Sequence, residues 1–494
     1  MIDESVRWLD DRLGIAKGGR TMLDKIFPDH WSFMLGEIAL YSFVVLIATG
    51  VFLSLYYIPS AHEVVYHGSY LPLRGQRVSE AYSSTVGLSF DVKSGLLIRQ
   101  THHWAADVFL GSIAVHMARI FFTGAFRKPR ELNWIVGVTM LMLGIVNGFL
   151  GYSLPDDLVS GTGIRIAYSI IESVPLVGSY LGFFLFGGNY PGNGIIIPRF
   201  FLLHVLILPV IIGGLIAVHL GLLVKQKHTQ FPGKGKTEDN VVGTPMFPTF
   251  IAKTTGFMFM TSAVLLLLGG LAQINPIWQF GSYDASKISY AVQPDWYMGW
   301  LDGALRIMPS WEWVGWGHTL PLEVFLPAVV FPGLTFGFFW GWPHIEKRFT
   351  KDVATHNLLD RPRDRPKRTA FGAAMLMFYF MLFAASSTDV MANFFNVSLN
   401  VVLWTFRVIV FVIPIITYFV TYQICNEMRA AEGIGKRKRA MVVSRSDTGA
   451  YSTVTAEPRP GDDAHELDAI PVPTYINLTP EELETGPGVR RVMR

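Results

Sequence analysis

Four histidines in two apolar stretches have a spacing that could do chemistry. His102 and His116 are 14 residues apart in RQTHHWAADVFLGSIAVHMAR, and His204 and His219 are 15 apart in HVLILPVIIGGLIAVH. At about 100° per residue, the first pair shares one face of a helix, roughly 21 Å apart. A ligating side chain inside a membrane helix is costly and is therefore a functional hypothesis by default. Two such helices can hold two metal centres stacked across a membrane.

The ligand type indicates which metal centre this would be. Neutral imidazole on both axial positions suits haem iron. The chain has one cysteine, Cys425, which excludes a covalent C-x-x-C-H haem site and leaves axial ligands and packing to hold the group. A single histidine can instead form a hydrogen bond between helices, but that alternative explains two matched pairs poorly.

Glycines repeat the spacing in two other apolar stretches. Gly36 and Gly50 are 14 residues apart, and so are Gly137 and Gly151. Glycine lets a flat macrocycle approach a helix backbone closely. The alternative is ordinary packing of small residues between membrane helices.

The composition is that of a polytopic membrane protein. Of 494 residues, 51% are hydrophobic and only 16% are charged. The polar N-terminus lacks the pattern of a signal peptide. We expect an all-α fold of eight membrane-spanning helices, the first four forming a bundle around two b haems. The expected spans lie near 35–57, 103–123, 134–154, 200–224, 250–272, 322–342, 370–390 and 401–424.

Charge distribution orients these helices. Basic residues concentrate in the loops 124–133, 225–249 and 343–369, so the positive-inside rule places both termini in the cytoplasm. The second and fourth helices then run in the same direction, with His102 and His204 at the outer side and His116 and His219 at the inner side. We divide the chain into four regions. They are a cytoplasmic N-terminal segment with surface amphipathic helix (1–32), a dihaem bundle (33–230), a C-terminal membrane region (231–425) and a cytoplasmic tail (426–494). The tail is polar, which indicates disorder or a docking segment for a partner.

Arginines and one loop complete the candidate set. Arg99, Arg119 and Arg199 lie close in sequence to the histidines, where each can pair with a haem propionate or extend to lipid headgroups. In the loop between the fifth and sixth helices, Pro294, Asp295, Trp296 and Tyr297 place a carboxylate among aromatic residues. That carboxylate can accept a proton from a bound hydroquinone. An aromatic belt at the membrane interface is the alternative.

These motifs together resemble a known family. From about Asp29 to about Cys425 the chain resembles cytochrome b of the cytochrome bc family of quinol–cytochrome c oxidoreductases. The resemblance rests on the histidine spacings and on RQTHHWAA, FFTGAFRKPRELNW, GYSLPDD, PRFFLLH and PDWY. The family's PEWY appears here with Asp295 in place of the usual glutamate. SGTG after GYSLPDD, and HNLLDRPRDRPKRT, resemble the actinobacterial branch.

The resemblance implies specific site residues. It assigns His102 and His204 to a low-potential outer haem, and His116 and His219 to a high-potential inner haem. The four glycines match the family's haem-facing positions. Pro294 to Tyr297 match the quinol-oxidation site, joined by Gly161 and Thr162. For the cytoplasmic quinone site, topology offers Asp29, Lys225 and Lys227, with His30 and His228 at the same depth.

The resemblance also implies a reaction and partners. One electron of a quinol goes to a Rieske iron–sulfur subunit.

 

The substrate typical of the branch is menaquinol. The other electron crosses two non-covalent b haems to a quinone on the cytoplasmic side, and protons are released outside. The implied partners are a Rieske subunit, a dihaem cytochrome c subunit, a second copy in a dimeric complex, a terminal oxidase in a supercomplex and membrane lipid, with no nucleic acid. The implied location is a bacterial plasma membrane.

Two other functions remain open from the residues. A dihaem membrane anchor for another dehydrogenase would share the histidine pairs but would lack a quinol-oxidation loop, which the PDWY sequence argues against. A transporter without redox activity could use the histidines to relay protons. A reduced-minus-oxidised spectrum separates these readings, because the transporter would show no haem signal.

Overall fold

The computed structural model describes residues 8, 10–12, 14, 23–287 and 293–432, and the backbone of 440–445 and 451–456. The chain divides into two units, Met1–Gln423 and Ile424–Arg494. The first unit holds the membrane helices and every candidate site residue, and it is described first.

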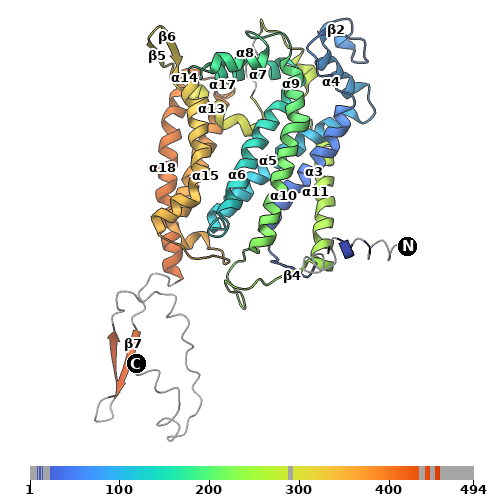
Figure 1. The fold of residues 1–494 in the computed structure, drawn as a ribbon. Helices are drawn as coiled ribbons and strands as arrows, with labels where there is room; N and C mark the ends of the chain where they lie inside the picture. The colour runs from blue at the N-terminus through green and yellow to red at the C-terminus, as the bar shows by residue number, and fades with distance from the viewer. Residues whose placement is uncertain are drawn as a thin grey trace. The chain divides into compact units, whose positions relative to one another are not determined.

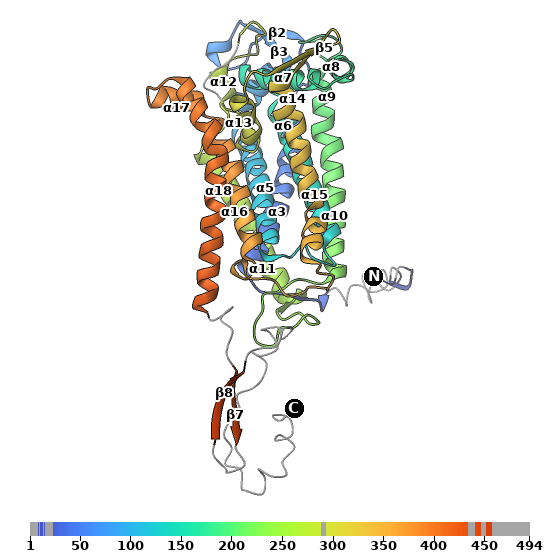
Figure 2. The same ribbon diagram turned by 90° about the vertical axis from the view of Figure 1, so that its left-hand side faces the viewer.

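Eight helices among the described residues are long and apolar enough to cross a membrane, as predicted. They stand side by side in Figures 1 and 2. The spans are α3 (Met34–Ser54), α5 (Gly95–Thr123), α6 (Glu131–Tyr152), α9–η3–α10 (Ile196–Gln226), η4–α11 (Met246–Leu271), α14–η6–α15 (Leu322–Thr350), α16 (Pro366–Ala385) and α18 (Leu399–Ala431).

The second span begins eight residues earlier than its apolar stretch predicted. Helix α5 starts at Gly95 instead of near 103. The polar residues Arg99, Gln100 and Thr101 lie inside this helix and are buried, at 8%, 5% and 0% exposure. Hydropathy assigns such residues to a loop, but here neighbouring protein covers them. His102 therefore lies about two turns inside the helix rather than at its boundary.

Other boundaries differ because amphipathic turns extend the apolar segments. Helix α15 continues to Thr350, and α18 continues to Ala431, through the predicted tail boundary at 426. Helix α16 ends at Ala385 instead of near 390, and a separate helix, α17 (Thr388–Phe394), follows it.

Short elements connect the spans at the end of the bundle that carries α7 and α8 (Figure 1). They are hairpins β2–β3 (Glu63–Val65, Arg77–Ser79) and β5–β6 (Glu312–Gly315, His318–Pro321), helices α4 (Glu80–Phe90), α7 (Leu158–Glu172), α8 (Gly178–Phe186), α12 (Ile277–Phe280) and α13 (Gly299–Ile307), and turns η2 (Leu71–Leu73) and η5 (Trp296–Met298). Asp157 caps α7 by accepting hydrogen bonds from the backbone N–H groups of Val159 and Ser160.

At the opposite end, β1 (Ile26–Phe27) pairs antiparallel with β4 (Thr244–Pro245). Turns η1 (Trp31–Phe33) and η7 (Pro362–Asp364) precede α3 and α16. The amphipathic helix expected within 1–32 falls mostly outside the described residues.

One buried cluster joins the first four spans to the loop before α13. Leu110 of α5, Val138 of α6, Ile212 of α10 and Tyr297 of η5 belong to it. On the outer surface of the helices, large apolar side chains are exposed, as in Val210 at 65% and Phe411 at 62%. Apolar residues pointing outward suit a hydrocarbon solvent. Packing thus fixes the loop of Pro294 to Tyr297 against the first four helices.

The second unit contains the end of α18 and a hairpin. Strand β7 (Ala440–Arg445) pairs antiparallel with β8 (Tyr451–Ala456). The sequence predicts a largely disordered tail with a docking segment as the alternative, and this stays a prediction. The remaining tail residues lie outside the described residues.

Candidate functional site

The four histidines meet in two pairs between α5 and the α9–η3–α10 span. The ring centroids are 6.2 Å apart for His102 and His204, and 6.5 Å apart for His116 and His219. A metal–nitrogen bond of about 2.0 Å places an imidazole centroid roughly 3 Å from the metal, so two rings on opposite faces of a haem are roughly 6 Å apart. Both pairs therefore have the separation that a six-coordinate haem iron needs.

A π-helical turn explains the unequal spacing of the two pairs in the sequence. His204 lies in η3 (Leu203–Ile207), whereas α5 is α-helical throughout. A π turn holds one more residue than an α turn, and such turns are frequent at functional sites. The 15-residue interval in α9–η3–α10 therefore matches the 14-residue interval in α5.

Hydrogen bonds fix the tautomers of the outer pair. The Thr49 hydroxyl donates to the carbonyl of Val45 at 2.6 Å, so its oxygen is left to accept from Nδ1 of His102 at 2.9 Å. Nδ1 of His204 lies 2.9 Å from the carbonyl oxygen of Asn147, which can only accept. Both Nδ1 atoms therefore carry the proton, and both Nε2 atoms keep a lone pair for a metal.

Each predicted glycine faces a different histidine. A Cβ atom at Gly36 would lie 3.2 Å from the His116 ring, and one at Gly50 would lie 3.2 Å from the His102 ring. At Gly137 it would lie 3.9 Å from the His219 ring, and at Gly151 it would overlap the His204 ring. Gly36, Gly50 and Gly151 thus leave room for the imidazoles themselves, whereas a Cβ at Gly137 would make only an ordinary contact. The predicted approach of a macrocycle to these glycines stays a prediction.

The three arginines differ in their contacts. Arg119 lies over the Phe33 ring at 4.3 Å, and its Nε and Nη2 atoms are buried without a hydrogen-bond partner among the described residues. Arg99 donates to the carbonyl of Asn275 at 2.9 Å and also keeps a buried, unpartnered Nε. Arg199 donates to the carbonyls of Phe184 and Leu185. Unpartnered guanidinium donors near the inner and outer histidines suit anionic propionates, whereas Arg199 is already engaged.

Asp295 lies at the centre of a hydrogen-bonded group. Its Oδ1 is 2.9 Å from Nε2 of His103, and its Oδ2 accepts from the Tyr297 hydroxyl at 2.8 Å. Burial raises the pKa of the Asp295 carboxyl, but His103 and Tyr297 lower it more, so that pKa lies below its usual range. Burial and the neighbouring carboxylate raise the pKa of Tyr297 well above its ordinary value. At neutral pH, Asp295 is therefore an ionised acceptor and Tyr297 a neutral donor.

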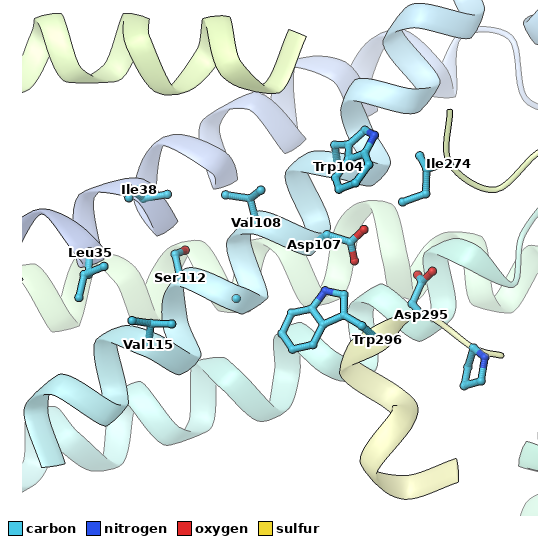
Figure 3. A pocket seen from close by; sticks show the side chains of 12 residues that line it. Leu35, Ile38, Trp104, Asp107, Val108, Ser112, Val115, Ile274, Asp295 and Trp296 are labelled. Atoms are coloured by element: carbon cyan, nitrogen blue, oxygen red, sulfur yellow. The ribbon is translucent and has the colours of Figure 1, made fainter. Parts of the chain in front are cut away.

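Three cavities meet at this loop. An outer histidine cavity of about 530 Å³ is lined by His102, His204, Asp295 and Tyr297, among others. An aromatic cavity of about 490 Å³ is lined by Trp296 and Tyr297 and by side chains of α5, α6, α15 and α16. A third cavity of about 730 Å³, drawn in Figure 3, is lined by Pro294, Asp295, Trp296 and residues of α3 and α5. The loop is the shared wall of all three.

Gly161 and Thr162 lie in α7, and the cavity linings above do not include them. Gly161 packs against the ring of Tyr283, and the Thr162 hydroxyl donates to the carbonyl of Leu158 at 2.7 Å. Their part in a quinol site stays a prediction.

The residues predicted for a cytoplasmic quinone site have separate neighbours. Asp29 forms an ion pair with Lys253 at 2.6 Å, Lys227 donates to the carbonyl of Asp239 at 3.3 Å, and Lys225 is exposed. His228 is more enclosed, with its ring 4.4 Å from that of Phe27 and its Nε2 buried without a partner among the described residues. Burial, with Lys25, Arg130 and Arg119, lowers the pKa of His228 to about 4. His228 is therefore a neutral, largely enclosed side chain, and burial also lowers the pKa of His30.

Two residues of the outer site were missed from the sequence. His103 and Asp107 are four residues apart on α5, and one side-chain ligand atom of each lies within 4.8 Å of the other and of Asp295. His103 has no part in the matched histidine pairs, because the adjacent His102 fills that place. Asp107 is the one acidic residue in the apolar stretch 103–123, and a charge inside a membrane helix is a signal that could have identified it.

Known proteins resemble the chain over most of its length. It is 49% identical over 464 residues to a "Cytochrome bc1 complex cytochrome b subunit" of Streptomyces coelicolor, covering 94% of this chain and 85% of the relative. The chain belongs to the cytochrome b subunits of cytochrome bc1 complexes. Subunits of the same description from Corynebacterium diphtheriae and Mycobacterium tuberculosis are 51% and 50% identical, each over 86% of this chain and 78% and 77% of the relative.

Two further comparisons agree with this membership. The family described as "Cytochrome b(N-terminal)/b6/petB" matches residues 107–282. A solved structure titled "Hyperthermophilic respiratory Complex III" has the same fold, with a TM-score of 0.61 over 85% of this chain and all of the other, at 21% identity. This cytochrome b is an integral membrane protein of electron transfer, and its family implies haem b as cofactor and a multi-subunit quinol–cytochrome c oxidoreductase as its setting.

Proposed function

We propose that this subunit oxidises a quinol beside Asp295 and returns one of its electrons across the membrane to a quinone on the cytoplasmic side. The second electron goes to a Rieske partner, and protons are released at the outer side. The observation that carries the proposal is that the PDWY loop forms a wall shared by the three cavities. Tyr297 lines both the aromatic cavity and the outer histidine cavity, so a substrate in the first lies next to the second.

The chain's own residues would hold two haems. His102 with His204 would hold the outer haem iron and His116 with His219 the inner one, and Arg99 and Arg119 would pair with the propionates. Bound haem would supply a one-electron carrier near each side of the membrane. The separations of the ring centroids support this assignment.

The aromatic cavity supports a substrate with a long apolar tail. On α5 its lining extends from Leu110 to Phe122, which is about 18 Å at 1.5 Å per residue. Thr335 is one of its few polar lining residues, and its hydroxyl accepts from that of Tyr379 at 2.8 Å. An isoprenoid tail would lie along this length, with the quinol headgroup at Trp296 and Tyr297. Menaquinol is the proposed species, because the similar subunits come from Streptomyces, Corynebacterium and Mycobacterium.

Asp295 would take the quinol proton as a general base. Its carboxylate is ionised, and its two hydrogen bonds, from Tyr297 and with His103, hold it at the loop. Pro294 and Trp296 would shape the site, and Gly161 and Thr162 on α7 would contribute to it as the family resemblance implies. On the cytoplasmic side, Asp29, Lys225 and Lys227, together with His228, would supply protons or hydrogen bonds to the reduced quinone.

The setting of this reaction is also proposed. The subunit would work in a bacterial plasma membrane with both termini in the cytoplasm. It would work beside a Rieske subunit and a dihaem cytochrome c subunit, in a dimer and in a supercomplex with a terminal oxidase. The basic loops on one side of the spans support the orientation.

Replacing the proposed base tests the function. Asp295→Asn in the intact complex should retain both haem signals and most quinol binding, but turnover should fall by about 10²-fold, at the low end of general-base effects. Asp295→Glu should keep much of the activity, since it restores the family's more usual residue. Full turnover in the Asn variant would contradict the assignment of Asp295 as the base.

A further inference from the structure

A second buried carboxylate lies beside the proposed base, and the proposed reaction does not yet use it. Asp107 is on α5, one turn after His103, and its Oδ1 is buried without a hydrogen-bond partner among the described residues. An ionisable group within a membrane helix is costly unless it is paired or functional. Figure 3 shows its side chain close to those of Asp295 and Trp296.

The helix geometry brings Asp107 to the base and keeps it away from the histidine pair. Four residues turn an α-helix by about 40° beyond one full turn, so Asp107 shares a face with His103, whereas His102 points about 100° away from His103. The side-chain ligand atoms of His103, Asp107 and Asp295 all lie within 4.8 Å of one another. One water molecule can bridge such a gap between two carboxylates, because each hydrogen bond spans about 2.8 Å.

Asp107 also lies on the wall of the third cavity, with few other ionisable groups near it. His103 on its own helix, and Asp295 and Tyr297 on the loop, are the titratable groups that face it. Helix α3 contributes apolar side chains to this cavity, as in Leu35 and Ile38. Ile274, between α11 and α12, and Pro294, just before η5, line it too. Helices α12 and α13 lie at the α7–α8 end of the bundle in Figure 2. The cavity therefore reaches the end at which quinol oxidation is proposed.

We propose that Asp107 receives the proton that Asp295 takes from the quinol and releases it to water in this cavity. The proposal rests on the proposed function of Asp295. In the step, the O–H bond of protonated Asp295 breaks and an O–H bond on Asp107 forms through one bridging water. Asp107 then loses that proton to cavity water, and both carboxylates are ionised again. His103 neither gains nor loses a proton in this step, and it positions Asp295 through their hydrogen bond.

The test uses three variants of the intact complex. Asp107→Asn removes the acceptor, Asp107→Glu restores a carboxylate, and Ser112→Ala changes another polar residue on the same cavity wall. Turnover should fall about tenfold in the Asn variant, less than for loss of a directly acting base. The Glu variant should recover most of the rate, and Ser112→Ala should match the wild type. Haem spectra and the KM for quinol should stay unchanged in all three.

Chemical rescue separates proton transfer from a structural role. Formate, a small weak acid that can enter an open cavity, should raise the turnover of Asp107→Asn and leave the wild type unchanged. A wild-type rate in the Asn variant would overturn the proposal, and so would a loss that neither Glu nor formate repairs. Loss of turnover when EDTA is added to the wild-type complex would also overturn it, because the three side chains would then be holding a divalent cation.

The outcome for Asp295 keeps the two proposals distinguishable. A slow Asp295→Asn variant beside normal Asp107 variants would reject the relay and leave the proposed function standing. Normal turnover in Asp295→Asn would reject the proposed base itself.

Discussion

The outer and inner histidine pairs have nearly the same ring separation but are held in different ways. In the outer pair, Nδ1 of His102 donates to Thr49 and Nδ1 of His204 donates to the carbonyl of Asn147. In the inner pair, Nδ1 of His116 is buried without a partner among the described residues. Hydrogen bonds at the second nitrogen orient a ligand and raise its basicity. The outer pair is therefore fixed by polar contacts, and the inner pair depends more on packing and on Arg119.

This difference bears on the proposed haem potentials. A more basic imidazole stabilises ferric iron, which lowers the potential, and a nearby guanidinium stabilises the ferrous state by its charge. The outer pair has the first feature and the inner pair has Arg119 with two unpartnered donors. The contrast agrees with the proposed assignment of low potential to the outer site and high potential to the inner site.

The largest expected contrast concerns the glycines. A Cβ at Gly151 would overlap the His204 ring, whereas one at Gly137 would lie 3.9 Å from the His219 ring. Gly151→Ala should therefore abolish the outer haem signal, while Gly137→Ala should keep the inner one and the bulkier Gly137→Leu should impair it. Gly214→Ala on α10, where a Cβ would meet nothing within 4 Å, is the matched control. Haem content is measured by difference spectroscopy. Equal content in all four variants would mean that these glycines serve only ordinary packing between helices.

The arginines should give a smaller, one-sided effect. Arg119→Gln removes two unpartnered donors, and hydrogen bonds to charged groups contribute about 1.5–3 kcal/mol. Haem affinity at the inner site should fall roughly tenfold or more, and the potential of the inner haem should fall with it, while the outer haem is unaffected. Arg119→Lys should retain part of both properties, because it keeps the charge. Redox titration of the two signals measures this, and an unchanged inner signal in the Gln variant would exclude a propionate partner.

The smallest effect should come from Thr49. Thr49→Val is nearly isosteric and removes the acceptor for Nδ1 of His102, so the ligand becomes less basic. The outer haem potential should rise and the inner one should stay constant. Thr405→Val is the control, since its hydroxyl makes the same bond to the carbonyl four residues earlier on an exposed face of α18. A shift of both potentials, or of neither, would remove the proposed distinction between the pairs.

The sequence predicted the spans and the pairing of the histidines, because both follow from helical periodicity. It did not predict the π turn at His204, because a hydropathy pattern carries no information about the hydrogen-bond register of a helix. It placed the start of α5 too late, because buried polar residues such as Arg99 read as a loop. The group of His103, Asp107 and Asp295 joins residues about 190 positions apart, so only the packing of the loop against α5 reveals it.

Haem counting in single-ligand variants tests the central claim most directly. The wild-type complex should show two b-type signals from this subunit in a reduced-minus-oxidised spectrum. His102→Ala should lose the outer signal alone, and His116→Ala should lose the inner signal alone, because each site needs one histidine from α5 and one from the α9–η3–α10 span. The account would be contradicted if the wild type held fewer than two such haems, or if either variant lost both signals or neither.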